Sequence, residues 1–334
     1  MQDNNETRVS GAANNPDKQE IMAAGSGMPR VEEAHFHQFP GARPPDRQRS
    51  VNSGGLALAV YEWGDADAPP LLLVHGALDF ARTFDVFAPL LADAGYRVVS
   101  YDHRGHGDSE HAALYSWTAD ERDMLAVADS ISRPPFIAIG HSKGGSMLAH
   151  SIQALPHRFS RFVAIDGLPF RSPHSDATLR ERKSMTADVI TGWLDHRRAT
   201  GSLARKPGSL EELAQRRARM NPRLSHEWLC YLASQGARQD VDGWRWKIDP
   251  ALRPGGFGTH RSRWMTDRLP GFPIPMLALF GTVREPMGWD VKPADLMPYF
   301  APSTQVEVVQ DTGHFIHIER PQQTAALVCD FLKT

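Results

Sequence analysis

Short apolar runs alternate with amphipathic segments along most of the chain. Runs at residues 69–77, 97–101, 135–140 and 161–167 have the character of parallel strands that are buried on both faces. Segments with helical periodicity separate these runs, and a strand hairpin at 47–63 precedes them. The alternation predicts an α/β fold with a doubly wound, mostly parallel sheet, whose ligands bind beyond the carboxyl ends of the strands.

The alternation stops between residues 168 and 268, where no run resembles a buried strand. Helical patterns occupy 179–194, 210–220 and 226–235, and Ser209 followed by Glu212 forms a capping box that marks a helix start. An alternating segment at 243–250 is typical of extended structure. Strand patterns then return at 275–281 and 305–309, and the last element is a helix at 322–332. The expected organisation is therefore a first core segment (46–167), a helical cap insertion (168–268) and a second core segment (269–334).

Residues 1–45 show no sustained apolar period and are rich in Asn, Asp, Glu, Gly and Pro. Such a segment buries too little surface to offset its ordering entropy, so we expect a flexible tail that becomes ordered where Phe36 and Phe39 dock.

Composition narrows the functional class only slightly. The 334 residues are 41% hydrophobic and carry a formal charge of -2, which predicts a sizeable core and no nucleic-acid partner. Cys230 and Cys329 lie far apart without metal-ligand spacing, so they are interpreted as small apolar residues in a reducing compartment. The chain has neither an apolar run near the roughly 18 residues of a spanning helix nor a signal-peptide core. We expect a cytoplasmic protein without a membrane span, and the oligomeric state is left open.

The strand at 135–140 leads through Gly140-His141-Ser142-Lys143-Gly144 into a helix. A serine on such a strained strand-to-helix turn exposes its Oγ, so Ser142 is the candidate nucleophile. The candidate base is His314, which follows the strand at 305–309 and precedes the last helix. His317 is interpreted as a surface or packing histidine, because no further ligand cluster accompanies it, and no metal or cofactor is expected.

The carboxylate that would orient the base has two candidates. Glu285 follows the strand at 275–281 and is the first choice. Asp166 ends the strand after the Ser142 helix and would project from the same sheet edge, so it is the alternative. Either side chain can accept the imidazole N–H and stabilise the imidazolium.

Acyl transfer also requires two donors for the developing oxyanion. The backbone N–H groups of Lys143 and Ala77 are the candidates, and His75 is expected to brace the Ala77 loop. For the Lys143 side chain, pairing with a cap carboxylate is favoured over attraction of an anionic substrate. The expected lining of an acyl pocket is His75, Leu78, Trp193, Trp228, Trp244 and Trp246. The cap aromatic residues among these fit equally well as the core of the insertion.

Together, four motifs resemble those of the α/β-hydrolase superfamily, from about residue 46 onward: His75-Gly76, the segment 102–109, the Ser142 pentapeptide, and Gly313-His314-Phe315 with Glu319-Arg320-Pro321. The resemblance implies an eight-stranded core, a helical cap after the sixth strand, and hydrolysis of esters or related acyl compounds without a cofactor. The segment 243–250 is similar to cap sequence in serine-hydrolase-like members. The family usually has Asp where this chain has Arg284, and Met, Gln or an aromatic residue where it has Lys143.

A dehalogenase or an epoxide hydrolase needs a carboxylate nucleophile, which would be an aspartate at position 142. Ser142 argues against both. The expected function is a serine hydrolase that cleaves a small-molecule carboxylic ester, thioester or lactone through an acyl-enzyme. Cleavage of a carbon–carbon bond in a diketone by the same triad is an alternative. A hydrolase-like receptor that binds a ligand without turnover is another.

Overall fold

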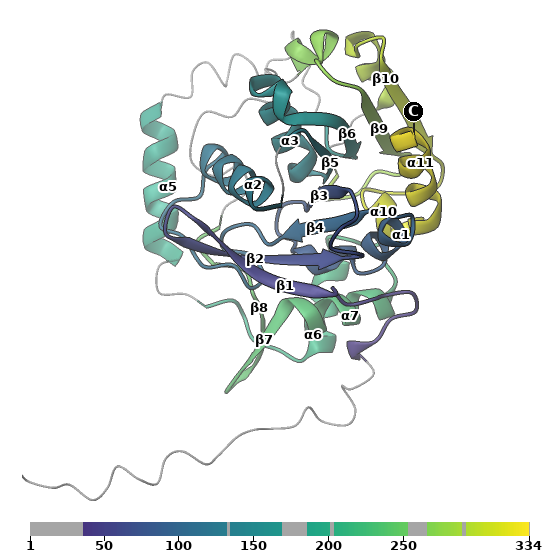
Figure 1. Cartoon of the computed structure of the whole chain (residues 1–334). Coiled ribbons are helices and arrows are strands. Elements are labelled where there is room, and N and C mark those ends of the chain that lie inside the picture. Colours follow the sequence, from purple (N-terminus) through teal and green to yellow (C-terminus); the bar gives the residue numbers. More distant parts are fainter. Residues whose placement is uncertain are drawn as a thin grey trace, which may run out of the picture. The chain divides into compact units, whose positions relative to one another are not determined.

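A computed structural model describes residues 36–131, 134–168, 186–200, 204–252, 266–288 and 292–333. Its main sheet has eight strands in the order β1-β2-β4-β3-β5-β6-β9-β10 (Figure 1). Their bounds are β1 Arg47–Ser53, β2 Leu56–Trp63, β3 Pro70–Val74, β4 Arg97–Tyr101, β5 Phe136–His141, β6 Phe159–Ile165, β9 Met276–Gly281 and β10 Thr304–Val309. Strand β2 runs antiparallel to β1 and β4, and the other neighbours are parallel. The predicted doubly wound, mostly parallel sheet is confirmed.

Both faces of the sheet are buried, as the continuous apolar strands predicted. In β3, Leu72 and Val74 belong to one core cluster, whereas Leu71 and Leu73 belong to the other. The first cluster contains residues of α2 (Trp117–Ile131) and α3 (Lys143–Ala154). The second contains residues of α1 (Phe87–Asp93) and α11 (Pro321–Lys333), so helices cover the sheet from both sides (Figure 1).

The sequence pattern predicts a helix over residues 84–94, but α1 begins only at Phe87. The segment before it, Ala81–Phe84, forms a separate 3₁₀ turn. Pro89 is the third residue of α1, within the first turn, where its missing N–H costs nothing. An α-helix that began at Phe84 would place Pro89 beyond the first turn, without a hydrogen bond and against the Asp85 carbonyl.

The segment between β6 and β9 is here called the insertion, and its described residues 186–200 and 204–252 form three helices and a hairpin. These are α5 Thr186–Thr200, α6 Leu210–Ala218, α7 His226–Gly236, β7 Ala237–Asp240 and β8 Gly243–Trp246. Residues 169–185, which include part of the helix expected at 179–194, lie outside the described residues. The extended segment expected at 243–250 pairs antiparallel with β7, a strand that its own sequence did not reveal.

The insertion has an apolar core of its own, and the loop after β3 contributes to it. Trp228, Leu229 and Tyr231 of α7 pack with Phe80 of that loop. Phe39 docks on the same cluster, with its ring centroid 4.9 Å from that of Trp228. The remaining short elements are α9 Pro293–Leu296, α10 Ile316–Glu319 and the 3₁₀ turns Pro156–Arg158, Leu269–Gly271 and Met297–Tyr299. Every helix among the described residues falls short of the length and apolar character that crossing a membrane requires.

Candidate functional site

Ser142 lies on the turn that joins β5 to α3. Its backbone adopts φ 52° and ψ -119°, a strained conformation for a residue with a side chain. The turn is tight enough to require glycine on both sides of Ser142. A Cβ on Gly140 would lie 2.5 Å from the Gly145 nitrogen, and one on Gly144 would lie 2.3 Å from the Val74 oxygen. The glycines of the pentapeptide are therefore explained by close backbone packing.

Asp166 and His314 meet at the same edge of the sheet. Strands β5 and β6 pair His141 with Ile165, and the Ser142 N–H donates to the Ile165 carbonyl at 3.1 Å. Asp166 is the first residue after β6, and Ser142 is the first residue after β5, so the two lie at the same end of these neighbouring strands. His314 Nδ1 is 2.5 Å from Asp166 Oδ2. With Nδ1–H directed at the carboxylate, Nε2 is the nitrogen that remains for proton transfer.

His141 ties the loop of the candidate base to the turn of the candidate nucleophile. Its Nε2–H donates to the His314 carbonyl at 3.0 Å, and the two rings pack with centroids 4.6 Å apart. Burial lowers the pKa of His141 well below its usual value, so the ring is neutral and acts as a fixed donor. His314 itself is only 2% exposed.

Glu285, the first choice for the orienting carboxylate, contacts the main chain of His314 instead of its ring. Its Oε2 accepts from the His314 N–H at 2.5 Å, and burial raises the pKa of the carboxyl group. A Cβ on Gly313 would lie 2.1 Å from this oxygen, so a side chain at position 313 would displace the Glu285 carboxylate. The geometry favours Asp166 as the carboxylate that orients the His314 ring. Glu285 holds the backbone of the loop that carries His314. A cavity of about 290 Å³ lies beside both carboxylates.

The loop after β3, which carries Ala77, is held by three histidines. His75 is fully buried, and its Nε2 accepts from the His103 N–H at 3.0 Å. His103 Nε2–H donates in turn to the His75 carbonyl at 3.0 Å, and His106 Nε2 accepts from the Leu78 N–H at 3.3 Å. These bonds hold the buried His75 within its own loop, so its contacts are those of a bracing residue. Among the described residues, the Ala77 N–H has no acceptor, as an oxyanion donor requires.

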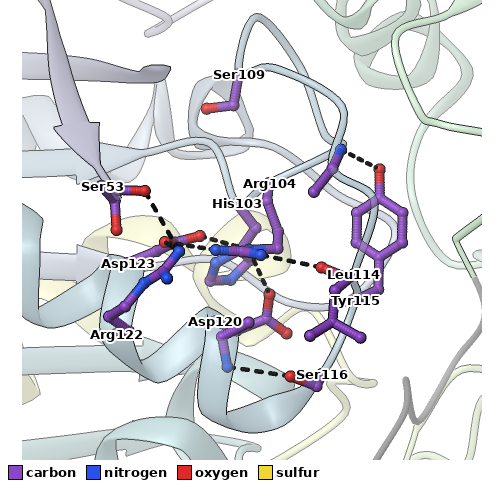
Figure 2. Close-up of polar contacts among 12 residues, drawn as sticks. Ser53, His103, Arg104, Ser109, Leu114, Tyr115, Ser116, Asp120, Arg122 and Asp123 are labelled. Atoms are coloured by element: carbon purple, nitrogen blue, oxygen red, sulfur yellow. Dashed lines mark hydrogen bonds and ion pairs between the residues drawn. The ribbon is translucent and has the colours of Figure 1, made fainter. Parts of the chain in front are cut away.

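The loop that supplies His103 and His106 is itself held by a buried ion-pair network (Figure 2). Arg104 makes two hydrogen bonds to Asp123, at 2.6 and 2.8 Å, and a third to the Leu114 carbonyl at 2.9 Å. Asp123 lies on α2 and is fully buried. The planar guanidinium thereby fixes the loop after β4 to α2, and this loop in turn fixes the Ala77 loop.

Lys143 follows Ser142 and begins α3, where the backbone N–H lacks an intrahelical acceptor. Its Nζ is 2.6 Å from Asp120 Oδ2 and 5.7 Å from the centroid of the Trp117 ring. Both contacts are with α2, so the partner of the cation belongs to the core and not, as expected, to the cap. The side chain is 16% exposed, and its ammonium group forms an ion pair with the Asp120 carboxylate.

We expect Lys143→Gln to change the turnover of neutral and anionic esters by the same factor, because the ammonium is held by Asp120. A cation that bound a substrate carboxylate would instead contribute about tenfold or more for the anionic ester alone. The measurement is kcat/KM for a matched pair of esters with and without a terminal carboxylate, with Asp120→Asn as the control. A selective loss for the anionic ester would show that Lys143 binds substrate.

The aromatic residues expected in the pocket occupy different surroundings. Trp228 is 1% exposed and packs within the insertion core, as the alternative interpretation stated. Trp244 packs against the apolar residues between α6 and α7, and Arg197 lies over the Trp193 ring at 5.8 Å. Trp246 lines a cavity of about 470 Å³, which Arg205 and Asp249 also line. Leu78 has φ 56° and lies in the Ala77 loop.

Sequence reasoning missed two charged residues beside the Ala77 loop. Arg217 of α6 donates through Nη1 to the Leu78 carbonyl at 2.7 Å, and its Nη2 is 3.6 Å from Asp79 Oδ1. Burial raises the pKa of Asp79, although Arg217 opposes this shift. The position of Asp79, two residues after Ala77, was a usable signal. Arg217 offered none, because only the tertiary fold brings α6 to this loop.

Comparisons with known proteins find a family and relatives that match most of the chain. The model of the alpha/beta hydrolase family matches residues 71–327. The sn-1-specific diacylglycerol lipase ABHD11 of Mus musculus is 25% identical over 276 residues, which cover 80% of this chain and 82% of that protein. A serine hydrolase-like protein of Dictyostelium discoideum is 32% identical over 132 residues, which cover 38% of this chain and only 37% of that protein.

Solved structures share the fold. A hypothetical protein from Pseudomonas aeruginosa PAO1 superposes with a TM-score of 0.72 at 24% identity. The thioesterase domain from the curacin biosynthetic pathway superposes with a TM-score of 0.70 at 22% identity. Each alignment covers 86% of this chain and 99% of the other.

Proposed function

The chain belongs to the alpha/beta hydrolase family, and from this premise we propose that it is a serine hydrolase that cleaves a carboxylic ester, thioester or lactone through an acyl-enzyme. Membership confirms the resemblance found in the sequence motifs. The observation that carries the proposal is the contact between His314 Nδ1 and Asp166 Oδ2, at the sheet edge where the strained turn holds Ser142. A histidine oriented by a carboxylate is the base that a serine nucleophile needs, and the proposal requires that His314 Nε2 take the proton of Ser142 Oγ.

In the proposed first step, Ser142 Oγ attacks the substrate carbonyl and His314 Nε2 takes the hydroxyl proton. Asp166 stabilises the imidazolium that forms. The N–H groups of Ala77 and Lys143 donate to the developing oxyanion, each worth roughly 2.7 to 4 kcal/mol where such donors have been removed. His314 then returns its proton to the leaving alcohol or thiol, which completes the acyl-enzyme.

In the second step, His314 takes a proton from a water molecule that attacks the acyl-enzyme carbonyl. The same two N–H groups bind the second oxyanion, and the proton returns to Ser142 as the acid product leaves. Glu285 and His141 contribute by holding the His314 loop, so both are positioning residues in this mechanism.

The relatives support acyl compounds as the substrate class. One is named a diacylglycerol lipase, another is a monoglyceride lipase of Mus musculus, and a structural neighbour is a thioesterase domain. All three names describe hydrolysis of an acyl group from an alcohol or a thiol. An epoxide hydrolase is also among the relatives. This chain has Ser142, and not an aspartate, on the turn between β5 and α3. The proposal therefore does not include the alkyl-ester intermediate that a carboxylate nucleophile forms.

We expect the purified protein to hydrolyse at least one compound in a panel of p-nitrophenyl esters of graded acyl length, acyl thioesters, lactones and a diketone. Product analysis identifies whether the bond cleaved is carbon–oxygen, carbon–sulfur or carbon–carbon. A fluorophosphonate probe should modify Ser142 at about one equivalent per chain, located by peptide mass spectrometry. Saturable ligand binding without turnover or labelling would favour a receptor and refute the proposal, and cleavage of the diketone alone would favour a carbon–carbon hydrolase.

A further inference from the structure

Away from the Ser142 site, three potential metal ligands converge between α6 and α7. Glu211 lies on α6, and His226 and Cys230 lie on α7. Cys230 Sγ is 3.5 Å from Glu211 Oε2 and 3.4 Å from His226 Nε2, and the nitrogen and the carboxylate oxygen are 3.0 Å apart. For tetrahedral zinc, ordinary Zn–S, Zn–N and Zn–O bond lengths place such atoms about 3.3 to 3.6 Å apart. The three atoms are therefore close to one face of a zinc tetrahedron.

The two helices present these side chains from fixed backbones. His226 and Cys230 are four residues apart, so they lie on the same face of α7. Ser209 caps α6 and Ser225 caps α7, each by accepting an N–H of the first turn. Apolar residues of both helices pack together, including Leu210, Leu213 and Ala233. Little reorganisation is needed to bring the ligands to an ion.

Access and charge also suit a divalent cation. Cys230 is 1% exposed, whereas the side chains of His226 and Glu211 are 53% and 37% exposed. The ion would thus have a protein-covered side and an open side on which water completes the tetrahedron. A thiolate and a carboxylate neutralise its two charges, which offsets the unfavourable dipoles of the nearby helix N-termini. The second carboxylate oxygen of Glu211 accepts from Gln215 Nε2 at 2.7 Å, which orients the ligand oxygen.

We propose that Glu211, His226 and Cys230 bind one zinc ion that links α6 to α7. The thiolate and imidazole select zinc over magnesium and calcium, which prefer oxygen ligands. Binding releases the thiol proton to solvent and leaves the metal oxidation state unchanged. The proposal departs from the expectation of no metal, which rested on the distance of Cys230 from Cys329 in the sequence and on the lack of a ligand cluster around His317. The ligand signal was local in part, as His226 four residues before Cys230, but Glu211 joins them only through folding.

The test uses the full chain after treatment with a chelator, first with Co²⁺ and then with Zn²⁺. Cobalt bound to Cys230 should give a cysteinate-to-metal charge-transfer band in the near ultraviolet, which zinc abolishes at one equivalent. Zinc should also raise the midpoint of thermal unfolding. Cys230→Ala should lack the band, and His226→Gln and Glu211→Gln should bind zinc at least about 100-fold more weakly, because even the loss of an outer-shell partner costs 10- to 100-fold.

Cys329→Ala and His157→Gln serve as matched controls, since Cys329 lies on α11 and His157 is an exposed histidine outside the insertion. Both should retain the band and the affinity of the unmodified chain. His226 and Glu211 are partly exposed, so their variants decide the question even if Cys230→Ala is unstable. Absence of the cysteinate band, or equal zinc affinity in the unmodified chain and these two variants, would overturn the proposal.

Discussion

Ser142→Ala should lower turnover of the substrate identified in the panel by about 10⁴- to 10⁶-fold, because it removes the atom that forms the acyl-enzyme. The residual rate would come from substrate binding and the oxyanion donors, which the substitution leaves in place. KM should change little for the same reason. The measurement is steady-state kcat and KM, supported by single-turnover kinetics that detect an acyl-enzyme in the unmodified protein and none in the variant.

Ser151→Ala is the matched control for this prediction. Ser151 lies on α3, nine residues beyond Ser142, and is 5% exposed. The same chemical change in the same helix should leave kcat unchanged, and fluorophosphonate labelling should persist. A Ser142→Ala variant that retains turnover within tenfold of the unmodified protein would show that Ser142 is not the nucleophile.

Ser142 could be singled out from the sequence as the candidate nucleophile because the requirements of its turn are local. Gly140 and Gly144 stand beside Ser142 in the chain, and the structure explains both by backbone contacts that exclude a Cβ. The sheet was equally accessible, because a strand buried on both faces is apolar throughout, as in β3. His314 could be chosen from its place between β10 and the last helix.

The acid could not be chosen in the same way, because two carboxylates satisfy the local rule. Strands β6 and β9 are parallel neighbours that pair Ile165 with Leu279, so Asp166 and Glu285 both follow the same edge of the sheet. Which one contacts the imidazole depends on side-chain direction: Asp166 has φ 41° and contacts the ring, whereas Glu285 contacts the backbone. The sequence does not show in which direction either side chain points.

The insertion shows a second limit. Trp228 is as compatible with a pocket as with a core when only its helix is known, and its burial is decided by Phe39 and Phe80, which are distant in sequence. Arg217 reaches the Ala77 loop, and Glu211 reaches α7, for the same reason. Helical periodicity identifies which face of α6 and α7 is apolar, but only the docked structure shows what that face contacts.

Asp166→Asn should lower kcat by about 10⁴-fold, as does the corresponding amide substitution in a serine protease triad. The amide can donate to His314 Nδ1 and thereby stabilise the tautomer whose Nε2 carries a proton and cannot accept one from Ser142. It also removes the charge that stabilises the imidazolium. KM should stay nearly constant, because the oxyanion donors do not contact Asp166.

Glu285→Gln is the matched comparison, and we expect a loss of about tenfold or less. The amide oxygen of glutamine can still accept from the His314 N–H, so the substitution weakens a charge-assisted hydrogen bond, worth about 1.5 to 3 kcal/mol when lost entirely, without removing it. Steady-state kcat for both variants, with thermal unfolding midpoints to verify folding, separates the two roles. The reverse order, a collapse in Glu285→Gln with near-normal turnover in Asp166→Asn, would identify Glu285 as the acid and would mean that the His314 ring turns from Asp166 during catalysis.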